Sequence, residues 1–520
     1  MNDIQYALDN TVKADYNKIM NNRSGKLLTK SKFMAGLQCP RYLWFYVNEP
    51  QRLPPPDMVT QHTFDQGHEV GELAKQLFPA GIDMAGLGFR EMLTKTSACL
   101  RERNPIFEAA IQSGQLYARI DILSPSADGT WDIVEVKSGT SVKDENIADV
   151  AFQRYVCTQY GLRVNRCRLM YLNREFIKHG EIDPAELFLD TNITEEVAEL
   201  TGGMADMVED MLLTMAGTPP DPIISRACNS PYTCPLKNEC WQALPENPVT
   251  GLYRIGDKID GLLRRGITAI TEIPEDFELN DKQQIQQHCI RAGQPHVNIR
   301  EIASFLEQLP YPHYYLDFET FATAVPRFDG TRPYQNIPFQ FSLHITADEK
   351  SPLEHHHFLY QGNADPRPEF VSALHSAMGE GGRVIVYNQS FEQKIMEELV
   401  AEFPDYREWV TDVVARMADL IIPFRAFHYY HPAQQGSASL KYVLPALTGI
   451  GYDRLNISNG QIASLKYFQA AFGNDTPAEA KTALFEDLLE YCGQDTEGMV
   501  RIIEVLRGLV ADSNSTNDMA

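Results

Sequence analysis

Two carboxylates stand two positions apart in the apolar and aromatic segment "HYYLDFETFAT", residues 313–323. Alternate residues of a strand project from one face, so Asp317 and Glu319 would lie side by side and repel each other without a cation between them. The pair therefore indicates a metal site. Taken alone, such a pair is more often an edge strand whose acidic face meets water, so the rest of the chain has to decide.

Further acidic residues follow in an order that suits the same chemistry. Glu392 falls in the first turn of a helix predicted after the strand "RVIVYN", and Tyr491 and Asp495 lie four apart on one face of a late helix. The order resembles the DEDD exonucleases of the RNase H-like fold, in the variety that carries a tyrosine. Individually, Tyr491 also suits a core tyrosine and Asp495 a solvated acid.

The resemblance to DEDD exonucleases implies specific roles. The four acids Asp317, Glu319, Glu392 and Asp495 would bind two divalent cations, Mg²⁺ or Mn²⁺, and Tyr491 would orient the attacking water. The third acid of that family is usually Asp, and here it is Glu392, which puts the metal geometry at that position in question.

A second group of charged residues lies in "GQLYARIDILSPSADGTWDIVEVKSG", residues 114–139. Two strand-like runs flank the turn "SPSADGT", which predicts a hairpin. Asp121 lies on its first strand, and Glu135 and Lys137 lie two apart on the second strand, facing the same way. Taken singly, these residues would be explained as a salt-bridge partner and a cross-strand charge pair.

With Gly67 and His68 near the start of a predicted upstream helix, this group resembles the PD-(D/E)XK nuclease core, in its RecB-like branch. The resemblance implies a site for Mg²⁺ or Mn²⁺ made of His68, Asp121, Glu135 and the carbonyl of Val136. Without it, His68 is explained as a helix-surface residue.

Two more residues take roles from the same RecB-like resemblance. Lys137 would orient or help deprotonate the attacking water and offset charge that develops on the phosphate. Gln153 stands where the family has a Gln-x-x-x-Tyr signature, but position 157 is Cys157, so that motif matches only in part, and Tyr155 and Tyr160 are the alternatives for the missing tyrosine.

Cysteines flank the predicted nuclease core. The segment "CNSPYTCPLKNEC" spaces Cys228, Cys234 and Cys240 six apart, and Cys39 stands near the other end of the domain. One cysteine before the core and three after it resemble the iron-sulfur subclass of RecB-like nucleases, including the AddB type. The resemblance implies a 4Fe-4S cluster that closes a long loop of the chain. A tetrahedral zinc site remains open, because four thiolates suit either.

Length and composition set outer bounds on the protein class. At 520 residues the chain is too long for one core, and no apolar stretch approaches the roughly 18 residues of a membrane span. The first residues do not have the pattern of a secretory signal, so a cytoplasmic location and no membrane partner are expected. The net charge of −24 opposes binding of a polyanion through the overall field, but a local basic groove would still admit nucleic acid.

These patterns predict an α/β protein with two principal domains. We expect a flexible leader over residues 1–26, a restriction-endonuclease-like PD-(D/E)XK domain with its cysteine site over 27–245, a helical linker over 246–300, an RNase H-like (DnaQ-type) mixed-sheet domain over 301–512 and a disordered tail over 513–520. The linker faintly resembles helix-hairpin-helix modules. Residues 310–505 also look like an uncharacterised bacterial domain family found fused behind RecB-like nucleases.

The expected function is a metal-dependent nuclease with two active sites that acts on DNA, in repair, recombination or defence against foreign DNA. Two alternatives stay open. The first is an RNA 3'-exonuclease, because the chemistry does not depend on the 2'-hydroxyl. The second is a nucleic-acid-binding scaffold in which one or both sites are inactive.

Overall fold

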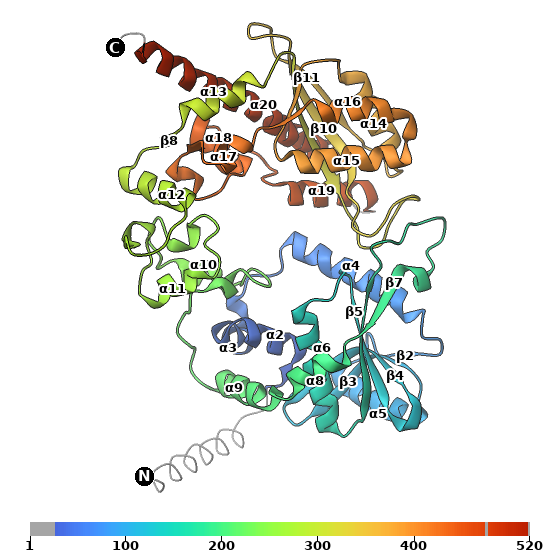
Figure 1. The fold of residues 1–520 in the computed structure, drawn as a ribbon. Coiled ribbons are helices and arrows are strands. Elements are labelled where there is room, and N and C mark those ends of the chain that lie inside the picture. The colour runs from blue at the N-terminus through green and yellow to red at the C-terminus, as the bar shows by residue number, and fades with distance from the viewer. Residues whose placement is uncertain (1–25, 474–476, 518–520) are drawn as a thin grey trace. The chain divides into compact units, whose positions relative to one another are not determined.

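A computed structural model describes residues 26–473 and 477–517 of the chain (Figure 1). The described residues fall into two units by their contacts. The first unit takes in the chain up to Asp57, Thr63–Ala243 and Ala324–Pro333. The second takes in Met58–His62, Leu244–Thr323 and the chain from Tyr334 onward. Apart from Lys26, the leader expected over residues 1–26 lies outside the described residues.

The first unit is built on a mixed sheet. In the part of the chain that the structure describes, this sheet has seven strands in the order β2-β3-β4-β5-β6-β7, and β1 pairs with β4. The strands are β1 (Leu28–Thr29), β2 (Ile82–Asp83), β3 (Ile106–Ser113), β4 (Leu116–Pro125), β5 (Trp131–Lys137), β6 (Val164–Leu172) and β7 (Phe188–Asn192). The pairing of β4 with β5 is antiparallel and that of β5 with β6 is parallel, so the sheet is mixed.

The expected hairpin is present as β4 and β5, with Ile122 opposite Val134. Its turn places Asp128 and Gly129 at φ of 56° and 72°, in the left-handed region that Asp and Gly tolerate better than most residues. The hairpin therefore holds Asp121 on one strand close to Glu135 and Lys137 on the next.

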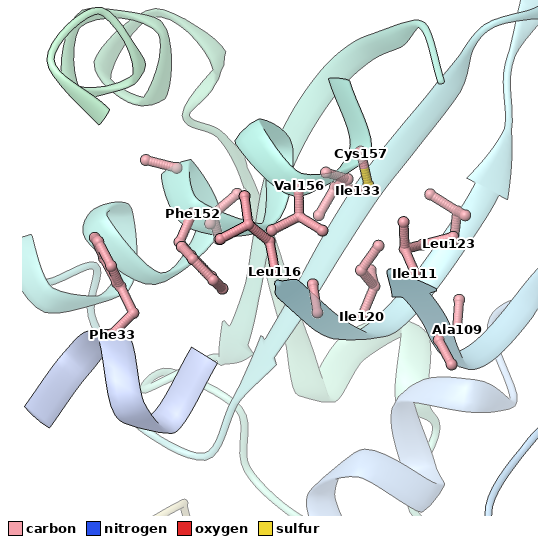
Figure 2. Close-up of a cluster of buried hydrophobic side chains, with 14 of the residues drawn as sticks. Phe33, Ala109, Ile111, Leu116, Ile120, Leu123, Ile133, Phe152, Val156 and Cys157 are labelled. Carbon is pink, nitrogen blue, oxygen red and sulfur yellow. The ribbon is translucent and has the colours of Figure 1, made fainter. Parts of the chain in front are cut away.

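The helices of the first unit pack on this sheet and on one another. They are α2 (Lys30–Gln38), α3 (Pro40–Asn48), α4 (Met58–Lys75), α5 (Phe89–Glu102), α6 (Asp144–Tyr160), α7 (Pro184–Leu187), α8 (Thr194–Thr201), α9 (Met204–Ala216) and α10 (Lys237–Trp241). Figure 2 shows Phe152 and Val156 of α6 among buried apolar side chains of the sheet. Phe33 of α2 stacks on Phe152 with ring centroids 4.7 Å apart. Truncating such a buried aromatic residue to Ala costs about 3–5 kcal/mol, so this packing holds α2 and α6 firmly.

The first unit also contains a segment from far along the chain. Ala324 and Val325 belong to a buried cluster with Val70 and other apolar residues of α4, β3, β4, β5 and β6. The amide of Ala324 donates to Oε1 of Gln66, and Lys178 pairs with Asp329 at 2.6 Å. Residues 324–333 are thus part of the core of the first unit.

The second unit is built on another mixed sheet. Within the described residues it has five strands in the order β11-β10-β9-β12-β13, and a separate pair joins β14 to β8. The strands are β8 (His296–Val297), β9 (His313–Phe321), β10 (Ile337–Thr346), β11 (Glu354–Leu359), β12 (Arg383–Val386), β13 (Met417–Asp419) and β14 (Tyr429–Tyr430). The central strand β9 is antiparallel to β10 and parallel to β12.

The two faces of β9 have different surroundings. Tyr314, Leu316 and Phe318 enter a core shared with α14, α15 and α16, which lie on one side of the sheet (Figure 1). The long helix α20 packs on β9 and β10. The helices of this unit are α11 (Lys258–Arg264), α12 (Asp281–Ala292), α13 (Ile299–Glu307), α14 (Arg367–Ala377), α15 (Gln389–Glu402), α16 (Arg407–Ala415), α17 (Ile422–Arg425), α18 (Leu440–Thr448), α19 (Gly460–Phe472) and α20 (Ala478–Asn517). The alternation of β9 therefore turns Asp317 and Glu319 away from the apolar core.

Two segments depart from the sequence expectations. The residues expected to form a linker, 246–300, cluster with the second unit, where β8 pairs with β14. The tail expected to be disordered over 513–520 is helical as far as Asn517, and 518–520 lie outside the described residues. A helix extends past its last packed turn because adding one residue to an existing helix costs little.

The mixed α/β class predicted from the sequence is confirmed for both units. Across the residues that the structure describes, no helix combines the length and the apolar character that a membrane crossing requires.

Candidate functional site

Three acidic side chains of the second unit converge on one point. Asp317, Glu319 and Asp495 each offer a carboxylate oxygen, and these oxygens all lie within 4.8 Å of one another. Asp317 and Glu319 project from β9, and Asp495 reaches them from α20. Together with Glu392 they form what we call the C-terminal acid cluster. A group of carboxylates this close is suited to hard divalent cations, which prefer oxygen ligands.

Glu392 reaches this cluster from the first turn of α15. Asn388 precedes the helix with φ of 80°, and its amide donates to Oδ1 of Asp419 at 2.9 Å, which fixes the sharp turn between β12 and α15. Glu392 is 1% exposed, and its Oε2 is buried without a hydrogen-bond partner among the described residues. A buried carboxylate oxygen without a partner is costly, so this oxygen is available to a cation. The carboxylate oxygens of Glu392 are not among the three ligand atoms, from Asp317, Glu319 and Asp495, that lie within 4.8 Å of one another.

The acids raise one another's pKa. Burial, with repulsion from Asp495, raises the pKa of Asp317 well above its ordinary value. Burial and the charge of Asp317 do the same to Glu319 and to Glu392. Burial raises the pKa of Asp495 to about 6. Bound cations would relieve this repulsion, so the residues present fit a divalent metal site.

Two tyrosines and a lysine surround Asp495. The Tyr452 hydroxyl donates to Oδ1 of Asp495 at 2.5 Å. Hydrogen bonds from Tyr452 and Tyr491, together with the charge of Lys441, act to lower the pKa of Asp495 against burial. The ammonium of Lys441 lies 5.6 Å from the ring centroid of Tyr491, and its charge also acts on Glu319. Tyr491 was predicted from the sequence, whereas Tyr452 and Lys441 were not.

The first unit gathers a second set of charges around Glu135, which is fully buried. Its Oε1 accepts hydrogen bonds from Lys30 at 2.5 Å and Lys137 at 2.6 Å, and its Oε2 accepts one from Gln153 at 2.6 Å. Asp149 binds Lys137 at 2.8 Å. We call these residues, with Asp121, the N-terminal lysine–acid site.

Asp121 lies beside this network and accepts a hydrogen bond from the amide of Val136 at 2.8 Å. His68, Asp121, Glu135, Val136 and Lys137 line one cavity of about 230 Å³. His68 is exposed on α4. Among the described residues, His68, Asp121 and Glu135 do not bring three ligand atoms within 4.8 Å of one another. The structure therefore places the predicted ligands around one cavity, with the acid Glu135 held by lysines.

The two acids of this site have opposite pKa shifts. Burial, with repulsion from Glu135, raises the pKa of Asp121 to about 7. Burial alone would raise the pKa of Glu135, but the charges of Lys137 and Lys30 outweigh it and hold that pKa below its ordinary range. Burial alone would lower the pKa of Lys137, but the charges of Glu135 and Asp149 outweigh burial, so the pKa is raised above its ordinary value. One acid is thus kept charged while its neighbour titrates near neutrality.

The four predicted cysteines line one cavity of the first unit, although among the described residues no three of their sulfur atoms lie within 4.8 Å of one another. Cys39 joins α2 to α3, Cys228 lies in a short helical turn (Arg226–Cys228), and Cys240 lies in α10. With Cys234 they line a cavity of about 80 Å³, and we call them the cysteine group. All four are free thiols, and burial raises the pKa of Cys234 to about 11, an effect that charges on the other three would increase. The donor set suits a metal that binds thiolates.

Some residues of these sites carry weak signals in the sequence. Asp149 precedes Gln153 by four positions, so helical periodicity alone places both on one face of α6. Cys157 is fully buried in the core of the first unit. Lys30, which is separated from Glu135 by 105 positions, has no signal that local patterns reveal.

Comparisons with known proteins give a domain family and distant relatives. Residues 314–439 match a family described as "Domain of unknown function (DUF2779)". "Uncharacterized protein MG366" of Mycoplasma genitalium is 24% identical over 214 residues, which cover 38% of this chain and 32% of that protein. "Uncharacterized protein UU173" of Ureaplasma parvum serovar 3 is 25% identical over 229 residues, 39% of this chain and 32% of that protein. The match therefore spans about a third of each relative's length.

A solved structure titled "Crystal structure of SSO0001" aligns over 44% of this chain and 95% of its own chain, with 15% identity and a TM-score of 0.20.

Proposed function

We propose that this protein is a metal-dependent nuclease with two active sites and that its substrate is DNA. The observation that carries the proposal is the C-terminal acid cluster, in which three carboxylates meet within 4.8 Å and a fourth has a buried oxygen without a partner among the described residues. Neighbouring like charges in a buried place are unfavourable unless a cation binds them. Their cost to folding is best explained by a catalytic role.

The cluster would act as the 3'-exonuclease site. Asp317, Glu319, Glu392 and Asp495 would hold the cations, which supply charge to stabilise the transition state of phosphodiester hydrolysis. Tyr491, which lies one helical turn before Asp495 on α20, would orient the attacking water. The Tyr452 hydroxyl would keep the carboxylate of Asp495 in one orientation and ionised. Lys441 would add a positive charge beside the phosphate.

The N-terminal lysine–acid site would cut DNA independently. His68, Asp121 and Glu135 are the residues that would hold a divalent cation, because they line one cavity. Lys137 would orient the attacking water, with its position set by Glu135 and by Asp149. Gln153 would keep Glu135 in place through the bond to Oε2. The resemblance to RecB-like nucleases agrees with this assignment.

The cysteine group would hold a 4Fe-4S cluster. A single zinc ion binds sulfur at about 2.3 Å and needs little space. Among the described residues, no three of the cysteine sulfur atoms lie within 4.8 Å of one another, which is wider than the sulfur spacing around one zinc ion and favours a larger, multi-iron cluster. Bound there, the cluster would connect α2, α3 and α10 and stabilise the first unit.

The test is a digestion panel with the full-length protein. Single- and double-stranded DNA and RNA, labelled at either end, are incubated with Mg²⁺, Mn²⁺ or a chelator. The variants are Asp121→Asn, Asp317→Asn and the double variant, and the matched control is Glu486→Gln, an exposed acid on the same helix as Asp495. Asp317→Asn should abolish release of mononucleotides from 3' ends, and Asp121→Asn should abolish the remaining cleavage.

Each outcome of this panel decides a part of the proposal. A double variant that still cleaves, or cleavage that survives the chelator, would overturn the assignment of both sites. Cleavage of RNA in preference to DNA would replace the DNA nuclease by an RNA 3'-exonuclease with the same chemistry. A wild-type protein that binds DNA without cutting it would favour a scaffold with inactive sites.

A further inference from the structure

Lys30 is the first residue of α2 and reaches into the N-terminal lysine–acid site from a distant part of the chain. It donates to Oε1 of Glu135 at 2.5 Å and lies 3.3 Å from Oδ2 of Asp149. The pairing of β1 with β4 brings it there, because Leu28 lies opposite Leu116 and Thr29 caps the helix that Lys30 begins. A hydrogen bond network therefore includes a second lysine that no motif reveals.

The position of Lys30 is not explained by the stability of its helix. The N-terminus of a helix carries a partial positive charge, which disfavours a cation in the first turn. The side chain is also only 27% exposed, so it has lost much of its hydration. The ion pair with Glu135 offsets both the unfavourable helix dipole and the lost hydration, which indicates that Lys30 has a role in the N-terminal lysine–acid site.

Lys30 occupies a lone-pair position on Oε1 of Glu135 at which a divalent cation would bind. A carboxylate oxygen has about two acceptor sites, and Oε1 of Glu135 receives both Lys30 and Lys137. A cation that binds this oxygen has to displace one of the two lysines. Lys137 is held more closely by Asp149, at 2.8 Å against 3.3 Å for Lys30. Lys30 is therefore the lysine that yields.

The displaced ammonium has a place to go. Lys30 lines the same cavity of about 230 Å³ as His68 and Asp121, and the cavity is the space in which a substrate would approach Glu135. An ammonium at the wall of this cavity, freed from Glu135, would face the negative charge of a phosphodiester.

We propose that Lys30 holds the place of the divalent cation while the N-terminal site is empty and moves to bind the scissile phosphate when the cation enters. This inference rests on the proposed nuclease function of that site. It makes Lys30 a catalytic residue that touches substrate. It also predicts opposite effects of its removal on cation binding and on cleavage, which a structural role would not produce.

The test uses the full chain with Asp317→Asn and Glu319→Gln, so that the C-terminal acid cluster neither binds metal nor cuts DNA. In this background Lys30→Met is compared with its parent for Mn²⁺ binding, followed by electron paramagnetic resonance, and for Mg²⁺-dependent DNA cleavage. Lys30→Met should bind Mn²⁺ about tenfold more tightly and lower kcat/KM by about tenfold or more, mainly through KM. Lys30→Arg should restore part of the cleavage.

Lys75→Met is the matched control, because Lys75 lines the same cavity but pairs with Glu72 and Asp83 and not with Glu135. It removes the same charge and should leave Mn²⁺ affinity close to that of the parent. If Lys30→Met binds Mn²⁺ no more tightly than the parent, or if Lys75→Met tightens binding equally, the inference is wrong. If the parent binds Mn²⁺ and responds to Lys30→Met but cuts no DNA, the displacement stands and the proposed nuclease function of this site fails.

Discussion

Tyr452 donates a hydrogen bond to Oδ1 of Asp495 at 2.5 Å, although 43 positions separate the two residues in the chain. The bond supports the ionised form of an acid whose pKa burial raises to about 6. Tyr491 lies one helical turn before Asp495 on α20 and also acts to lower the pKa of that acid. One acid thus has two phenols, and they are expected to have different roles.

The roles of Tyr452 and Tyr491 can be distinguished by substituting each with Phe. Tyr452→Phe should weaken cation binding by the C-terminal acid cluster and lower the free energy of unfolding by about 1–3 kcal/mol, because a buried acceptor loses its donor. Tyr491→Phe should keep cation binding and lower only kcat. The measurements are Mn²⁺ titration, thermal unfolding and exonuclease rates. Equal effects of both variants on Mn²⁺ affinity would contradict the separate roles.

Removing an acid of the cluster should stabilise the metal-free protein. Asp317→Asn relieves the repulsion that raises the pKa of Glu319 and Glu392, so the Tm without metal should rise by about 2–6 °C while exonuclease activity is lost. Differential scanning calorimetry in a chelator measures the first effect. Glu486→Gln serves as the control and should change neither quantity. A fall in Tm for Asp317→Asn would show that repulsion between these acids does not destabilise the metal-free protein.

The stability of the metal-free protein should decrease as the pH rises from about 4, the ordinary pKa of Asp in the unfolded chain, to about 7. Burial raises the pKa of Asp495 to about 6 and that of Asp121 to about 7 in the folded protein. The folded state therefore binds these protons more tightly than the unfolded state, and the stability that they contribute is lost as the pH passes through these values. Saturating Mg²⁺ should reverse the trend, because cations compete with protons for the carboxylates. Thermal unfolding across this range, with Mg²⁺ or a chelator, is the measurement.

The cysteine group should contain iron. Protein purified without oxygen should be brown and contain iron and sulfide, and Cys234→Ser should lose both and unfold at a lower temperature. Cys99→Ala, which removes a buried thiol elsewhere in the first unit, should keep the iron. A colourless protein with stoichiometric zinc would instead support the tetrahedral zinc site.

Local sequence patterns anticipated those parts of the sites that local geometry controls. The alternation of a strand put Asp317 and Glu319 on one face, and the hairpin put Asp121 near Glu135. The spacing of four residues in a helix put Tyr491 and Asp495 on the same face of α20. These relations depend on a single element or on adjacent strands, so they can be inferred without knowledge of the rest of the chain.

Relations between distant segments were not predictable in this way. Lys30 enters its site through the parallel pairing of β1 with β4, and Tyr452 meets Asp495 from the loop before α19. Neither contact repeats with a period or follows from a turn type. They depend on tertiary packing between segments that are far apart in the chain.

The segment 324–333 has a consequence for any attempt to divide the gene into two coding halves. A protein fragment that ends near residue 245 would contain every strand of the first sheet and all the charges of its site. It would nevertheless lack Ala324 and Val325, which occupy the cluster that includes Val70 and Ala74 of α4. Such a fragment would expose apolar surface and favour aggregation. Adding a peptide of residues 324–333 in trans offers a way to recover its solubility.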